Sequence, residues 1–112
     1  MITTVYDLNG IWIYDIAIGD ETVQGVVVMT PNGKADILQI KCRNGMLLCR
    51  AFDKDVMEPM DFPVAIFSAV DCEAMLQKSP LSLSSAAVEL GASMEMTGAE
   101  LCLLFNRTTT AS

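Results

Sequence analysis

Short runs of β-branched and aromatic residues follow one another along this 112-residue chain, separated by turn residues at roughly 8- to 12-residue intervals. The Asn44-Gly45 pair is the strongest turn signal, because both residues tolerate a positive φ. Regular spacing of this kind is typical of an antiparallel sandwich or barrel. We therefore expect strands at residues 10–18, 22–30, 34–42, 46–53, 62–69, 81–89, 94–96 and 100–108.

About eight strands with short connections use up most of the chain. The fold class that fits is all-β: an eight-stranded antiparallel up-and-down β-barrel forming a single domain over residues 1–108, with a frayed tail at 109–112. At most one short helix is expected, at about residues 71–78, where Asp71 is a candidate N-cap and Pro80 a stop signal. A β-sandwich and an α+β fold are the alternatives.

The first predicted strand is apolar on both faces. Trp12, Tyr14 and Ile16 share one face, and Ile11 and Ile13 lie on the other. A strand with one face in solvent would alternate apolar with polar residues instead. The outside of the barrel therefore needs a cover, and a homodimer through such strands is the simplest one.

Charge and residue types exclude several classes of function. Fourteen acidic and seven basic residues give a net charge of −7, which argues against nucleic acid as a direct ligand. The chain has no His, so a Ser-His-Asp triad, a Cys-His dyad and a His-containing zinc site are excluded. We expect no metal and no cofactor.

Compartment is predicted from what the sequence does not contain. The longest uncharged run, residues 22–33, is 12 residues long and too short to cross a membrane as a helix. Residues 1–7 have neither the basic region nor the apolar core of a signal peptide. We therefore expect a cytoplasmic protein with no membrane contact, in which the four Cys residues are free thiols.

Gly10 and Trp12 open the first predicted strand, and Arg107 lies near the end of the last. Neighbouring first and last strands would let Arg107 lie across the Trp12 ring and close one end of the barrel. The alternative is that Trp12 is a core residue and Arg107 a surface charge. A G-x-W on the first strand with a late Arg resembles the calycin pattern of lipocalins and avidins.

A second resemblance is to the GrlR-like negative regulators of type III secretion. It is carried by the N-terminal Gly-x-aromatic strand together with residues 25–29, 32–33, 81–84, 91, 97–98 and 106–107. The resemblance implies a small dimeric lipocalin-like barrel that acts by binding a transcriptional activator instead of DNA. The acidic Glu-Asp-Glu-Asp stretch of that family has no match, since the corresponding turn is Arg43-Asn44-Gly45.

Four acidic residues lie in one predicted loop: Asp53, Asp55, Glu58 and Asp61. They are our candidate docking site for a protein partner with a basic surface. A calcium site and a merely solvated loop are the alternatives. Residues 55–112 hold eight acidic and two basic residues, a net charge of −6, which favours docking on this half of the chain.

These observations favour a non-enzymatic binding protein, most simply a dimeric regulator that acts through a protein partner. One alternative is a carrier of a small apolar ligand in the barrel lumen, where the eight Met residues suit an adaptable lining. A less favoured alternative is an isomerase or hydrolase that uses Asp15 as a base inside the barrel.

Overall fold

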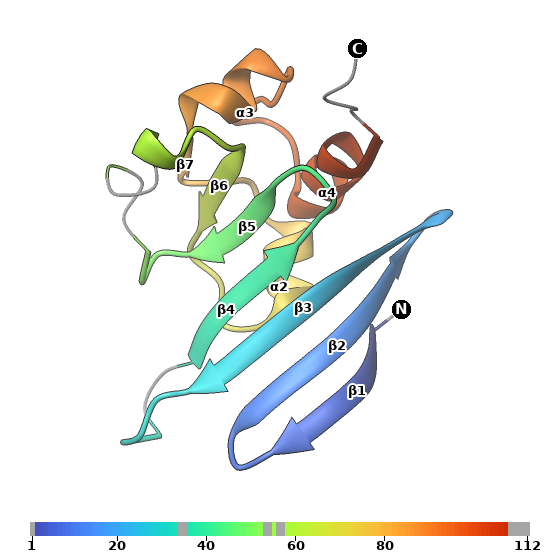
Figure 1. Cartoon of the computed structure of the whole chain (residues 1–112), viewed down its shortest axis with the longest axis vertical. Helices are drawn as coiled ribbons and strands as arrows, with labels where there is room; N and C mark the ends of the chain where they lie inside the picture. Colours follow the sequence, from blue (N-terminus) through green and yellow to red (C-terminus); the bar gives the residue numbers. More distant parts are fainter. Residues whose placement is uncertain (1, 34–35, 53–54, 56–57, 108–112) are drawn as a thin grey trace.

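One mixed sheet of seven strands dominates the computed structural model, which describes residues 2–33, 36–52, 55 and 58–107. The strands lie in the sheet in chain order (Figure 1). They are β1 (Ile2–Leu8), β2 (Ile11–Ile18), β3 (Glu21–Met29), β4 (Asp36–Lys41), β5 (Met46–Cys49), β6 (Val64–Phe67) and β7 (Ser82–Leu83). The helices are η1 (Glu58–Met60), α2 (Cys72–Gln77), α3 (Ser85–Glu89) and α4 (Gly98–Arg107).

The strands pair antiparallel except at β5 and β6, which run parallel. A parallel pair needs a crossover of about a dozen residues or more. Residues 50–63 make that connection, and η1 lies within it. Beyond this point the chain no longer follows the simple meander of its first five strands.

The sheet is open, so the predicted eight-stranded barrel is not formed. β1 and β7 are the two edges, with five strands between them. The prediction of a predominantly β fold is correct, and the short helix expected at 71–78 is present as α2, with Asp71 as its N-cap. The strand predicted to close the barrel against the first is a helix, and the described sheet ends in two separate edges at β1 and β7.

The C-terminal apolar run at 100–108 was predicted as a strand and is instead α4. Its buried residues follow a helical spacing: Gly98, Leu101, Cys102, Phe105 and Asn106. A capping box begins the helix. The Glu100 amide donates to Thr97 Oγ1 over 3.2 Å, and the Thr97 amide donates to Glu100 Oε1 over 3.0 Å.

Residues 81–89 also divide differently from the prediction. Two of them form β7, and Ser84 then caps α3, with its Oγ accepting from the Ala87 amide over 3.3 Å. The predicted strand at 94–96 is turn and irregular structure. In both places the sequence predicted a strand where the chain forms a helix cap or a turn, and the Ser residues of 81–89 favour the cap.

A strand absent from the prediction, β1, forms a hairpin with β2. The turn is Asn9-Gly10, whose φ angles are 50° and 80°, and the pair Leu8 and Ile11 closes it. Two consecutive positive φ angles are what a type I′ turn requires, and Asn-Gly is the pair that best adopts them. This turn fixes the register of Tyr6 to Leu8 against β2, and an irregularity between Thr4 and Tyr6 shifts the register of the rest of β1.

The main core lies between one face of the sheet, here called the inner face, and the helices α2 and α4. Its members are Ile16, Val23, Val27, Leu38, Ile40, Leu47, Ala65 and Phe67 from the sheet, and Cys72, Met75, Leu101, Cys102 and Phe105 from the helices. The two helices pack against each other as well as on the sheet. Figure 1 shows the lower ends of β1–β3 extending past this helical layer.

The opposite, outer face is covered over part of its width. Leu48, Val64 and Ile66 are buried there under Phe52 and Phe62 from the β5–β6 connection. Over β1–β4 the outer face carries exposed apolar side chains instead. Among the described residues, no helix is long and apolar enough to cross a membrane. The predicted tail at 109–112 lies outside the described residues.

Ser84 links β6 to α3, and its removal tests that link. Its buried Oγ accepts from the Val64 amide over 2.9 Å and donates to the Phe62 carbonyl over 3.2 Å. Ser84→Ala leaves the buried Val64 amide without this acceptor and removes the helix cap. The free energy of unfolding should fall by about 1–3 kcal/mol in urea denaturation. Ser79→Ala, at an exposed position, should change it by less than about 0.5 kcal/mol.

Candidate functional site

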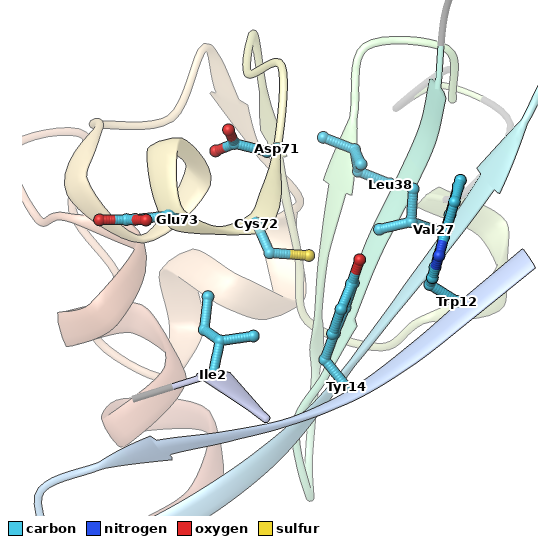
Figure 2. Close-up of a pocket in the computed structure, with 8 residues that line it drawn as sticks. All are labelled: Ile2, Trp12, Tyr14, Val27, Leu38, Asp71, Cys72 and Glu73. Atoms are coloured by element: carbon cyan, nitrogen blue, oxygen red, sulfur yellow. The ribbon is translucent and has the colours of Figure 1, made fainter. Parts of the chain in front are cut away.

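A hollow of about 380 Å³ lies between the inner face of the sheet and the start of α2 (Figure 2). Its volume is within the range of small-molecule binding pockets. It is lined by Ile2, Trp12, Tyr14, Val27 and Leu38 from the sheet and by Asp71, Cys72 and Glu73 from the helix side. We refer to it as the α2 groove.

Strand register builds the sheet wall of the α2 groove. Trp12 pairs with Val27, and Val27 pairs with Leu38, so the three side chains stand in one row across β2, β3 and β4. Tyr14 lies two residues further along β2 and therefore on the same face. Figure 2 shows the Trp12 and Tyr14 rings standing up from the sheet toward α2. The wall is thus aromatic and aliphatic.

Gly25 brings the helix close to the sheet beside this wall. It pairs with Tyr14, and a Cβ at this position would lie 3.1 Å from Cys72 Sγ and 3.0 Å from Ile16 Cδ1. A larger residue would therefore push against both neighbours. The missing side chain lets Cys72 reach the sheet and sets the depth of the α2 groove at this end.

Two carboxylates stand on the helix side of the groove. Asp71 Oδ1 accepts a hydrogen bond from the Ala74 amide over 2.8 Å, which caps α2 and holds the Asp71 side chain in place. Glu73 is exposed in the first turn of the same helix. The groove therefore has an apolar wall on the sheet side and two acidic residues on the helix side, and Figure 2 shows the Glu73 side chain pointing away from the two rings.

All four cysteines are free and buried, as expected for thiols outside a disulfide framework. Burial raises the pKa of the Cys72 thiol to about 11, and the charge of the neighbouring Asp71 adds to the rise. A hydrogen bond with Cys42, and burial after it, raise the pKa of the Cys102 thiol well above its usual range. The thiol lining the groove is therefore neutral at physiological pH and offers no activated nucleophile.

The predicted acidic docking loop is only partly a free surface. Glu58 begins η1, and its carboxylate accepts from the Ser85 amide over 3.0 Å and from Ser85 Oγ. It therefore holds the start of α3. Asp55 and Asp61 are exposed, and Asp53 lies outside the described residues. Of the four acidic residues, at least one serves the fold.

Arg107 and Asp15 also differ from their predicted settings. Arg107 is the last residue of α4 and is exposed, and an open sheet has no closure for it to stabilise. Trp12 lines the α2 groove instead. Asp15 is exposed on the outer face, so it lacks the enclosed environment that a catalytic base in a barrel lumen would have.

A second, more polar hollow of about 360 Å³ lies at the other end of the strands, lined by Asp15, Thr22, Val23, Gln24, Lys41, Cys42, Arg43 and Asn106. Buried Asn106 is bonded on both sides. Its Oδ1 accepts from the Arg43 amide over 2.7 Å, and its Nδ2 donates to Glu21 Oε1 over 3.2 Å. This network fixes the end of α4 against the sheet.

Comparison with known proteins supports the fold alone. No family model matches the chain, and no curated protein matches it in sequence. The structure is similar to a crystal structure of a protein of unknown function from Thermoplasma acidophilum, with a TM-score of 0.75 and 16% identity. The match covers 89% of this chain and 99% of that one. The resemblance to lipocalins and GrlR-like regulators stays a prediction from the sequence.

The raised pKa of Cys72 predicts slow alkylation. At pH 8 a thiol with a pKa near 11 holds about 100-fold less thiolate than an exposed cysteine. Iodoacetamide labelling of the native protein, read by peptide mapping, should show Cys72 reacting correspondingly slowly. Its rate should rise about tenfold per pH unit between pH 8 and 10, whereas an exposed thiol levels off. Rapid labelling at pH 8 would contradict a neutral buried thiol.

Proposed function

We propose that this protein binds a small organic cation with an apolar body, in the α2 groove. The observation that carries the proposal is that two aromatic residues, Trp12 and Tyr14, and two acidic residues, Asp71 and Glu73, line one hollow of about 380 Å³. Concave, mostly apolar sites with a few polar groups are the usual form of small-ligand pockets.

The apolar wall would take the body of the ligand. Trp12 and Tyr14 are half-buried, so part of each ring is available to a bound molecule. An aromatic face attracts a cation through its quadrupole, and Trp does so most strongly. Val27 and Leu38 add buried aliphatic surface beside the rings.

The carboxylates would select the charge. Asp71 and Glu73 flank the groove, and none of its eight described lining residues is basic. The overall net charge of −7 acts in the same direction by attracting cations and repelling anions over a longer range. An amine is therefore favoured over a carboxylate of the same shape.

This proposal keeps the sequence-based hypothesis of a small-ligand carrier and moves its site. The ligand would lie between sheet and helix, because the open sheet has no lumen. Regulation through a protein partner stays a proposal from the sequence, with Asp55 and Asp61 as its exposed candidate contacts. Ligand binding and partner binding are compatible, since the two candidate sites use different residues.

Binding of 4-phenylbutylamine and of 4-phenylbutyrate tests the charge preference. Trp12 is the only tryptophan, so its fluorescence reports on the α2 groove directly. The amine should bind with a Kd in the submillimolar to millimolar range, as a ligand of this size allows. The carboxylate should bind at least about tenfold more weakly. Equal affinities for the two compounds would overturn the proposal. So would a Trp12 fluorescence that neither compound changes at millimolar concentration.

Glu73→Gln should weaken amine binding about three- to tenfold and strengthen carboxylate binding, because it removes one negative charge from the rim of the groove. Glu89→Gln makes the same change on α3, away from the lining residues, and is the matched control. Equal effects of the two variants would mean that net charge, and not the groove, attracts the amine. Separately, native mass spectrometry of gently purified protein would identify a bound natural ligand by its mass.

A further inference from the structure

The outer face of β1–β4 is apolar over most of its area. Directly paired residues of antiparallel strands point to the same face, so the register assigns the residues of this face. Two rows of side chains cross it, here called the outer patch: Leu8, Ile11, Val28 and Ile37 in one row, and Tyr6, Ile13, Val26 and Gln39 in the next. Seven of these eight side chains are apolar or aromatic.

The outer patch is exposed to an extent that needs an explanation. Leu8 is 53% exposed, Tyr6 43% and Ile11 41%, while the residues on β3 are half-buried only by their neighbours in the sheet. In the part of the chain that the structure describes, the cover provided by Phe52 and Phe62 lies over β5 and β6. Contiguous apolar patches of this kind mark interaction surfaces.

A polar row borders the patch at one end. Thr3, Asp15, Gln24 and Lys41 pair in succession across β1–β4. Asp15 and Lys41 are both exposed, and Gln24 stands between them. Their strands are two spacings apart, about 9.6 Å, with the strand of Gln24 between them. The row thus carries one negative and one positive charge at fixed, separate places.

We propose that a second copy of this chain covers the outer patch, with the two sheets face to face and a two-fold axis running along the strands between β2 and β3. Such an axis lays each row over the same row of the other copy with the strand order reversed. β1 then lies over the partner's β4, and β2 over the partner's β3. The uncovered outer face of β1–β4 in one copy thus packs on the same face of the other copy. The segment that covers β5 and β6 lies beside this interface.

The paired rows are complementary under this axis. Ile11 lies over Val28 and Ile13 over Val26 of the second copy, which are apolar contacts at the centre. In the polar row, Asp15 lies over Gln24 of the second copy and one strand spacing from its Lys41, within reach of the long Lys side chain, so two ion pairs form at one end of the interface. Each charge therefore meets its opposite across the interface.

The alternative two-fold axis, perpendicular to the strands, is disfavoured. It would lay the polar row of one copy over an apolar row of the other. Asp15 and Lys41 would then press against Ile11 and Ile37, and charges without partners would lose water contact. The placement of the charges at one end of the patch thus selects the axis along the strands.

The available area is near the lower limit for a specific dimer. Four strands at about 4.8 Å spacing and about seven residues in length give a footprint of roughly 450 Å² on each copy. The two footprints together approach the roughly 1,000 Å² expected of a biological interface. The buried accessible surface is larger than this flat area, because the side chains project from the sheet. A dimer with a micromolar Kd is the expected result. The α2 groove stays open in it, because the groove lies on the inner face.

Charge reversal tests both the partner and the geometry. Asp15→Lys alone and Lys41→Glu alone should each weaken self-association at least about tenfold, because like charges then meet twice across the interface. The double variant D15K/K41E should dimerise like the wild type. An equimolar mixture of the two single variants should also dimerise, since every contact between the two different chains again joins opposite charges. Sedimentation velocity measures all four.

The matched control is Glu89→Lys, which reverses a charge on α3 and should leave the dimer unchanged. Circular dichroism checks that each variant is folded, and the mixture of single variants checks it again by recovering dimers. A wild-type protein that is monomeric at about 100 μM would overturn the proposal. So would a dimer whose Kd is unchanged in both single variants, which would indicate pairing through the edge of β1 or another surface.

Discussion

A sheet that is apolar on both faces has to be covered on both, and this constraint governs the whole molecule. α2 and α4 cover the inner face, held there by contacts such as that of Cys72 over Gly25. The β5–β6 connection covers part of the outer face through Phe52 and Phe62. The described residues leave the rest of the outer face, over β1–β4, uncovered. Incomplete cover leaves two open areas, the α2 groove inside and the outer patch outside.

Local signals predicted the first half of the fold well and the second half poorly. The strands expected at 10–18, 22–30 and 34–42 correspond to β2, β3 and β4. The run at 100–108 was wrong because an unbroken apolar segment fits a strand and a buried helix equally. The Thr97 to Glu100 capping box would have decided the question, and Asn9-Gly10 would have revealed β1.

The candidate site was harder to predict because its two walls are far apart in sequence. Trp12 stood out in the sequence, and Asp71 was identified as a helix cap, yet no local pattern indicates that they line one hollow. That proximity depends on α2 packing back on the sheet over Gly25. The same limitation applies to Glu58, whose sequence neighbours suggested a docking surface while its carboxylate bonds to Ser85.

The Asn9-Gly10 turn has a consequence for how the chain tolerates change. It sets the pairing of β1 with β2, and in a strand each step of one residue turns a side chain to the opposite face. A single-residue insertion in this turn would shift β1 by one position relative to β2. The side chains of Tyr6 and Leu8, which now face outward, would then face inward, and that of Asp7 would face outward. A length change in one exposed turn would thus alter both surfaces of the protein at once, although the turn itself belongs to neither.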